Sequence, residues 1–231
     1  MTEGVVAGAR PTALAERYLE AIYYIDHEGE TPRPGRLAEW LGVSAPTATV
    51  SLQRLARDGW VRSGSDHGLQ LTEAGAEAAA EIVRRHRILE RWLTDALGLD
   101  WATADLEAAS LAHGVSPLVL ERIDASLGHP STCPHGNVIP GRRPPRGGHL
   151  SRLADLEPGV RGRVARISEV AEHDAPHLLA TLSAHELYPG SEITVVDAGG
   201  SRIDTGSGPF DLDRLVARAV WVTGGGGSTQ D

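Results

Sequence analysis

The stretch RPGRLAEWLGVSAPTATVSLQRLARDG, residues 33–59, decides the fold of the first part of this chain. In its first half, apolar residues recur at spacings of three and four, which predicts an amphipathic helix over 33–43 that stops at Gly42. Ser44 is a good helix cap and Pro46 suits a first turn, so a second helix is predicted for the remainder of the stretch. Two helices joined by a short glycine-containing turn form a helix-turn-helix.

The flanking sequence predicts a winged version of this motif. Apolar residues at helical spacing predict another amphipathic helix over 12–27. After the helix-turn-helix, WVR and LQLT alternate like strands, and SGSDHG, 63–68, lies between them as a hairpin turn. We expect this hairpin to be the wing.

The second helix of such a pair lies in the major groove of DNA, with its N-terminal residues at the base edges. Here that surface is small and polar, with arginines further along for phosphates. We therefore expect methyl contacts and DNA shape to carry much of the sequence preference. The alternative is a three-helix packing unit that binds no DNA. The candidate DNA-contacting residues are Ser44, Ala45, Pro46, Thr47, Thr49, Val50, Ser51, Arg54 and Arg57.

The composition limits the compartment and the partners. At 231 residues the chain suits roughly one to three small domains. It has no apolar run of membrane-spanning length and no start typical of a signal peptide, and a single cysteine fits a reducing, cytoplasmic setting. The formal net charge of −9 argues against a protein that coats nucleic acid generally, although a small basic face can exist.

Helical patterns continue after the hairpin, over 71–99, 102–114 and 116–128. We expect these helices to form one unit that buries a dimer face. On the first of them, His86 and Glu90 are spaced i,i+4 and therefore share one face. Such a pair is either a metal-ligand pair or an exposed contact between neighbouring side chains.

The only cysteine, Cys133, lies two residues before His135 in the turn CPHG. From the residues alone, the pair is a metal site, a reactive thiol or a chance neighbourhood. Thiolate and imidazole favour borderline transition ions over calcium or magnesium. An enzyme with Cys133 as nucleophile and His135 as base is a further alternative, but the i,i+2 placement on a turn and the lack of an oxyanion-stabilising motif argue against it.

In the order and spacing of these segments, the chain resembles the diphtheria-toxin-repressor family of metal-dependent regulators, which includes the iron-dependent and manganese transport regulators. The similarity runs over about 12–141. A weaker similarity covers 150–223, where RGRVARISEV and LYPGSEITVV look like the SH3-like β-barrel that ends many members. The matching stretches are ERYLEAIYYI, TPRPGRLAEWLGVSAPTATVSLQRLARDGWV, DHGLQLTEAG, RRHRILERWLTDALGLD and GNVIPG.

The resemblance implies a homodimeric repressor of metal-homeostasis genes that binds double-stranded operator DNA when a divalent transition metal activates it. Mn²⁺ and Fe²⁺ are the favoured ions, and Zn²⁺, Co²⁺ or Ni²⁺ also suit the donors. The implied fold is mainly α with a small β domain. The predicted parts are a winged helix-turn-helix domain over 8–74, a helical metal-binding and dimerisation domain over 75–141, a linker over 142–149, an SH3-like (FeoA-like) domain over 150–223 and a flexible tail over 224–231.

The resemblance also implies two metal sites per subunit. The second is built around a histidine and a glutamate of the long helix, the C-P-H turn of the manganese-responsive branch, and ligands from the barrel. Taken as one helix, 168–182 would point Asp174 and His177 the same way, with Asp174 the favoured ligand and Glu172 and His173 as solvated residues. The full candidate set is His86, Glu90, Cys133, His135, Asp174 and His177.

The primary site departs from the family pattern. The positions of family ligands are occupied here by Arg17, Ala109, Ala112 and His113. Because Glu20 matches a carboxylate of the manganese branch, the site is either missing or reduced to Glu20 and His113, with His86 as a third ligand. Alternatively, Arg17 takes the place of the ion by pairing with Glu20 or Asp105. The alternative function is a DNA-binding regulator of the same fold that has lost metal switching.

Overall fold

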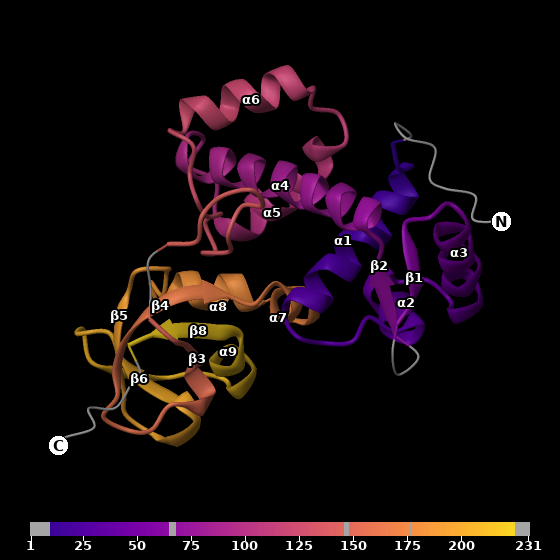
Figure 1. Ribbon diagram of the computed structural model, residues 1–231. Coiled ribbons are helices and arrows are strands. Elements are labelled where there is room, and N and C mark those ends of the chain that lie inside the picture. The colour runs from indigo at the N-terminus through magenta and orange to yellow at the C-terminus, as the bar shows by residue number, and fades with distance from the viewer. Residues whose placement is uncertain (1–9, 65–67, 146–147, 176, 225–231) are drawn as a thin grey trace. The chain divides into compact units, whose positions relative to one another are not determined.

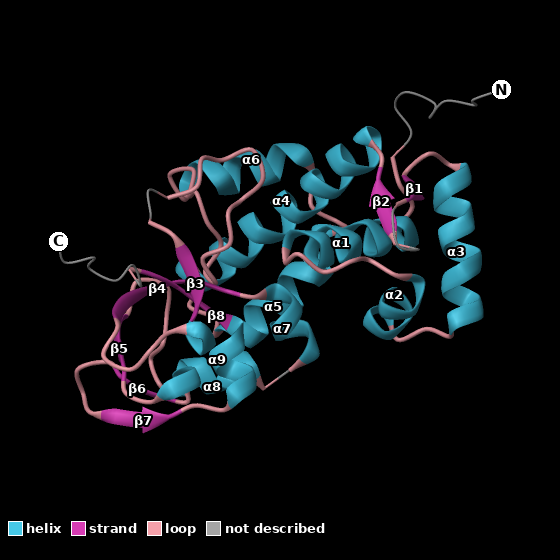
Figure 2. Ribbon diagram, turned by 60° about the horizontal axis from the view of Figure 1, so that its bottom comes forward, coloured by secondary structure: helices cyan, strands magenta, loops and turns pink. Residues whose placement is uncertain are grey.

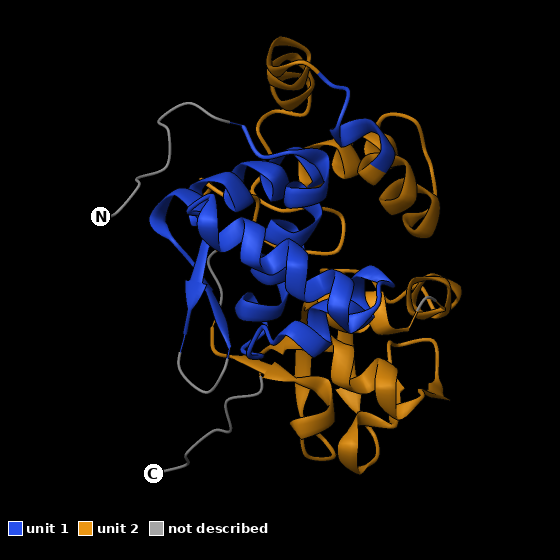
Figure 3. Cartoon of the chain, turned by 90° about the vertical axis from the view of Figure 1, so that its right-hand side faces the viewer, with its two compact units in different colours: residues 1–86, 110–115 blue, residues 87–109, 116–231 orange. Residues whose placement is uncertain are grey.

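The computed structural model describes residues 10–64, 68–145, 148–175 and 177–224 (Figure 1). None of the helices in these ranges combines the length and the apolar character needed to cross a membrane. The chain divides into two compact units, Met1–His86 with Ser110–Val115, and Arg87–Ala109 with Ser116–Asp231 (Figure 3). We call them the N-terminal and the C-terminal unit.

The first three helices of the N-terminal unit are α1 (Ala13–His27), α2 (Pro34–Leu41) and α3 (Ala45–Arg57). Their starts follow from side-chain caps, because Thr12 accepts a hydrogen bond from the backbone of Ala15 and Ser44 accepts one from Thr47. Gly42 ends α2 in the left-handed conformation, at φ 64°, which is strained for other residues. The helix-turn-helix predicted from residues 33–59 is therefore present.

The wing follows α3 as a two-stranded antiparallel hairpin, β1 (Val61–Ser63) and β2 (Leu69–Leu71), with Val61 opposite Leu71. Residues 65–67 of the predicted turn lie outside the described residues. The helices of this unit pack on a core whose largest fully buried side chains are Tyr18, Leu19, Ile22, Ile25 and Leu37.

A long helix, α4 (Glu73–Asp95), begins in the N-terminal unit and ends in the C-terminal unit. It requires glycine at Gly75, where a Cβ atom would lie 1.9 Å from the carbonyl oxygen of Trp60. It ends short of the predicted residue 99, and Gly98 adopts φ 69° just beyond. The helices α5 (Trp101–Ala112) and α6 (Pro117–Ser126) follow as predicted, with Ser116 capping α6.

The rest of the C-terminal unit is built on a six-stranded sheet in the order β3-β8-β4-β5-β6-β7, shown in magenta in Figure 2, and every neighbouring pair is antiparallel. Its core contains Leu153, Ile167, Leu178, Leu182 and Val222, all almost fully buried. The strands are β3 (Leu150–Arg152), β4 (Arg161–Ile167), β5 (Glu192–Val195), β6 (Arg202–Asp204), β7 (Pro209–Asp211) and β8 (Val220–Thr223). The short helices are α7 (Glu169–Asp174), α8 (Leu178–Ala184) and α9 (Arg214–Ala219).

The single helix expected over 168–182 is wrong, because it is divided into α7 and α8. Ala175 ends α7 with φ −131° and ψ 82°, outside the helical region. It precedes Pro176, and a proline ring disfavours helical geometry in the residue before it. Asp174 and His177 therefore do not share one helix face.

The first residue of the predicted linker over 142–149 is Arg142. Its guanidinium contacts the buried carboxylate of Asp124 near the end of α6. Residues 146–147 of this linker and 225–231 of the predicted tail lie outside the described residues. The predicted domain boundaries stay predictions, and the division into two compact units cuts α4 after His86.

Candidate metal centre

The CPHG turn is shaped by its own backbone and by strand β4 of the same unit. The amide of Cys133 donates to the carbonyl of Asn137 at 2.9 Å, and the amide of Gly136 donates back to Cys133 at 3.0 Å. Gly136 adopts φ 83°, and a Cβ atom there would lie 2.1 Å from the carbonyl oxygen of Ala165. The amide of Ile167 donates to the carbonyl of His135 at 2.9 Å, which joins the turn to the sheet.

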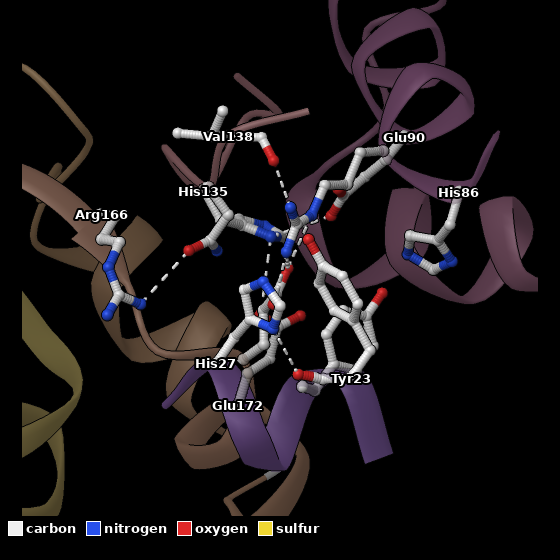
Figure 4. Close-up of polar contacts among 12 residues, drawn as sticks. Tyr23, His27, His86, Glu90, His135, Val138, Arg166 and Glu172 are labelled. Carbon is white, nitrogen blue, oxygen red and sulfur yellow. Dashed lines mark hydrogen bonds and ion pairs between the residues drawn. The ribbon is translucent and has the colours of Figure 1, made fainter. Parts of the chain in front are cut away.

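This turn brings Cys133 and His135 against Glu90 of α4. The sulfur, one imidazole nitrogen and one carboxylate oxygen all lie within 4.8 Å of one another. The three residues are almost completely buried, with exposed fractions of 1% for Cys133 and 2% for His135 and Glu90. Figure 4 shows His135 and Glu90 meeting in this pocket. We call these three residues the Cys133 centre.

The imidazole of His135 is held in one orientation. Its Nδ1 lies 2.8 Å from Oε1 of Glu90 and 3.5 Å from Oε2 of Glu172, and the ring meets Trp101 edge-on at 4.7 Å between centroids. Within the described part of the chain, its buried Nε2 has no hydrogen-bond partner. Once the ring loses its Nε2 proton it still donates from Nδ1 and carries a lone pair at Nε2, so this atom is suited to bind a metal.

The electrostatics of the pocket keep protons on its donors. Burial and the charge of Glu90 raise the pKa of Cys133 to about 11, although His135 lowers it. Burial raises the pKa of Glu172 to about 8, against the lowering effect of His135. For His135, burial lowers the pKa, but the carboxylates of Glu90 and Glu172 outweigh it and raise that pKa well above its usual value.

The pocket therefore fits a divalent transition ion. It combines a thiol, an imidazole nitrogen without a partner, and carboxylates, in a space from which water is largely excluded. Borderline and later transition ions prefer such mixed sulfur, nitrogen and oxygen donors. The same features argue against a nucleophilic cysteine, because a buried thiol with a raised pKa is a poor nucleophile.

A buried arginine on α4 fixes the other side of the turn. Arg87 contacts Glu169 through two of its nitrogens, with Nη2 at 2.7 Å and Nε at 3.0 Å from Oε1. Its Nη1 donates to the carbonyl of Val138, one of the dashed contacts in Figure 4. A paired guanidinium and carboxylate in this position hold α4, the turn and α7 together.

The predicted barrel ligands lie elsewhere. Asp174 is exposed at the end of α7, and His177 is exposed at the start of α8. Glu172, which we expected to be solvated, is the α7 carboxylate that approaches His135. A sequence signal for Glu172 was present but missed. Glu172 follows Ser168, the cap of α7, by four residues, which places its side chain one turn into a short helix.

The primary-site candidates belong to the N-terminal unit. Nδ1 of His86 lies 3.8 Å from Oε1 of Glu20, which also accepts a hydrogen bond from the hydroxyl of Tyr24 at 3.2 Å. Nδ1 of His113 lies 2.9 Å from Glu16, not from Glu20. Arg17 is exposed. Among the described residues, Glu20 and His113 belong to no group of three such ligand atoms within 4.8 Å of one another.

The predicted DNA-contacting residues lie on the outer face of α3 and its cap. Ala48, Leu52 and Leu55 bury the inner face, and Ser51 is half-buried. The remaining eight candidates are exposed, and Val50 is 60% exposed. An exposed valine on a helix that is otherwise small and polar suits contact with a thymine methyl group.

The fold and the pocket define a winged helix-turn-helix protein with a buried candidate metal centre. Three family descriptions match along the chain: the N-terminal DNA-binding domain of iron-dependent repressors over 12–69, their metal-binding and dimerisation domain over 72–141, and the FeoA domain over 151–224. The chain belongs to the family of iron-dependent transcriptional repressors.

Similar proteins agree with this assignment. The iron-dependent repressor IdeR of Mycobacterium tuberculosis is 35% identical over 220 residues, which cover 90% of this chain and 95% of the relative. The diphtheria toxin repressor of Corynebacterium diphtheriae is 35% identical over 193 residues, 80% and 85% of the two chains. A manganese-dependent transcriptional repressor solved with manganese has a TM-score of 0.79 and 34% identity, covering 91% and 99%.

Proposed function

We propose that this chain is a cytoplasmic, homodimeric repressor that binds operator DNA through α3 and is activated by a divalent metal at the Cys133 centre. The observation that carries the proposal is the convergence of Glu90, Cys133 and His135 in a buried pocket of the C-terminal unit. A divalent cation bound there supplies the positive charge that allows Cys133 to lose its proton.

Each residue of the pocket has a distinct part. Cys133 offers a sulfur, and His135 offers Nε2. Glu90 orients the imidazole from the opposite nitrogen, in the manner of the carboxylates that stand behind metal-bound histidines. Glu172 approaches the same nitrogen, Nδ1, from α7 at 3.5 Å, and we assign it with Glu90 to holding the imidazole in place.

Mn²⁺ and Fe²⁺ are the ions that we favour. The relatives are named for iron and manganese, and the donor set is acceptable to both. The affinity order of divalent ions favours Zn²⁺, Co²⁺ and Ni²⁺ at such donors, so the cellular supply decides which ion is used. A related repressor crystallised with Zn²⁺, at a TM-score of 0.73 and 26% identity, shows that such folds also accept this ion.

The homodimer is supported by apolar side chains that the C-terminal unit exposes on two helices. Leu106 of α5 is 70% exposed, and Leu118 and Val119 of α6 are exposed as well. Exposed large apolar side chains are common where a protein surface becomes an interface. In a two-fold dimer, the two α3 helices reach successive major grooves when they are about 34 Å apart.

Activation is proposed to work through linkage. The donors and the carboxylates that hold the imidazole come from the CPHG turn, from α4 and from α7, so metal-bound protein favours one arrangement of these three elements over others. An arrangement that also places two α3 helices correctly couples metal binding to DNA binding. A coupling free energy of about 1–3 kcal/mol is enough to change operator occupancy about 5–150-fold.

The test is a DNA-binding titration with an operator selected in vitro from random duplexes by Mn²⁺-loaded protein. We expect affinity for that duplex to fall at least about tenfold when a chelator is added. Equal affinity with and without the chelator would show a regulator of the same fold without metal switching. Non-specific affinity for a scrambled duplex is the control.

A further inference from the structure

A carboxylate in the N-terminal unit, Glu16 of α1, is held by two basic side chains. Oε1 of Glu16 lies 3.1 Å from Nη2 of Arg85 on α4, and Oε2 lies 2.9 Å from Nδ1 of His113. The side chains of Glu16 and Arg85 are largely buried, at 15% and 18% exposed, whereas His113 is half exposed. We call these three residues the Glu16 cluster.

Both carboxylate oxygens of the cluster already face positive or hydrogen-bonding side chains. One of them is a guanidinium, which stays charged at every accessible pH. A divalent ion at this position would have to displace His113 and stand close to the fixed positive charge of Arg85, which disfavours binding.

The neighbouring donors do not compensate for this. Glu20 and His86 lie 3.8 Å apart, and Glu20 also accepts from Tyr24. Ala112, one residue before His113, offers no side-chain donor. Within the described part of the chain, Glu16, Glu20 and His113 belong to no group of three ligand atoms that lie within 4.8 Å of one another.

We infer that the Glu16 cluster is a metal-independent ion-pair network that joins α1, α4 and the segment after α5, and that no regulatory metal binds at Glu16, Glu20 and His113. Together with the proposed function, on which this part rests, the regulatory metal is held at the Cys133 centre and not in the Glu16 cluster. Arg85 supplies permanently the positive charge that a metal ion would otherwise bring to Glu16.

The first experiment measures stability without metal. Glu16→Gln and Arg85→Met remove the ion pair, and Arg85→Lys keeps the charge. The control is Glu81→Gln, an exposed carboxylate on the same helix as Arg85. In chelator, we expect Glu16→Gln and Arg85→Met to melt about 2–4 °C lower than the parent chain. Arg85→Lys should melt between these two variants and the parent, and the control should melt with the parent. Melting of Glu16→Gln equal to that of the control would overturn the cluster's role.

The second experiment counts Mn²⁺ per chain by elemental analysis after dialysis. We expect the parent chain, Glu16→Gln and Glu81→Gln to hold the same number of ions, and Cys133→Ser to hold fewer. An ion that is present in the parent and lost in Glu16→Gln would overturn the inference and leave the proposed function intact. No ion in the parent would contradict the proposed function, whereas the melting experiment would still decide the cluster.

Discussion

Nδ1 of His135 lies 2.8 Å from Oε1 of Glu90, and both side chains are buried from solvent. The pair joins the CPHG turn to the long helix α4, 45 positions apart in the chain. Because Glu90 occupies Nδ1, the second ring nitrogen is directed away from it with no hydrogen-bond partner among the described atoms. The buried carboxylate of Glu90 thus orients the imidazole and leaves Nε2 able to bind a metal.

Replacing Glu90 with glutamine keeps an acceptor for His135 but removes the charge. Because the Glu90 carboxylate raises the pKa of His135, we expect Glu90→Gln to lower that pKa, measured by NMR titration of metal-free protein. We also expect Mn²⁺ affinity to fall about 10–100-fold, as is usual when a carboxylate that orients a metal-bound histidine is lost. If both the Mn²⁺ affinity and the pKa of His135 were unchanged, Glu90 would have no role in the centre. Glu81→Gln is the matched control.

Replacing Cys133 with serine tests the sulfur ligand at nearly constant volume. We expect Cys133→Ser to weaken Mn²⁺ binding by more than the roughly 10–100-fold expected for Glu90→Gln, because the serine variant loses a direct ligand. With Co²⁺ as a probe, the parent should show a sulfur-to-metal absorption band that the variant lacks. A band that persists in the variant would place the metal elsewhere, since the sequence contains no other cysteine.

Metal affinity should rise with pH. In metal-free protein the pKa of Cys133 is raised to about 11 and that of Glu172 to about 8, so both hold protons at neutral pH. Binding then releases protons, and each one released strengthens binding about tenfold per pH unit. Competition with a chelator of known pH dependence, between about pH 6 and pH 8, measures this slope. Cys133→Ser should give a shallower slope, and equal slopes would contradict the assignment.

The same shifts predict how the metal-free protein responds to pH. The folded chain holds protons on Cys133, His135 and Glu172 at pH values where the unfolded chain has released them. Stability from these groups is therefore present at low pH and is lost as the pH rises through the folded pKa values. We expect the melting temperature in chelator to fall between about pH 5 and pH 8, where Glu172 keeps its proton in the folded chain alone, and to fall less in Glu172→Gln. A rise in both proteins would contradict this account.

On the DNA side, Arg54 is exposed on α3 and is assigned to a phosphate. We expect Arg54→Ala to weaken binding to matched and mismatched duplexes alike and to reduce the salt slope of log affinity by about 1. Val50→Ala should instead change the preferred sequence, because a methyl contact reads the base. Arg214→Ala, at an exposed position on α9, is the control and should leave both properties unchanged.

Local sequence signals predicted the DNA-binding half well. The predicted start at residue 12, the cap Ser44 and the stop at Gly42 mark helix ends within one or two residues of those observed. Periodicity failed at Asp174 and His177 because Pro176 follows Ala175, and the restriction that proline imposes on its predecessor outweighed a continuous apolar pattern.

The polar contacts were less predictable, because they join residues distant in sequence. Glu16 meets Arg85 and His113 at separations of 69 and 97 residues, and no local spacing signals such a pairing. Likewise, Glu172 reaches His135 only because the amide of Ile167 fixes the CPHG turn against the sheet. The sequence identified Glu90, Cys133 and His135 as candidate ligands, whereas only the tertiary fold brought Glu172 beside them.

The most direct measurement is an anomalous-difference map from crystals grown with Mn²⁺, recorded on either side of the metal absorption edge. We expect a strong peak in each chain beside Sγ of Cys133 and Nε2 of His135, and none at Glu16 and His113. A map with no peak at the Cys133 centre, or with its strongest peak at Glu16 and His113, would contradict the proposed site.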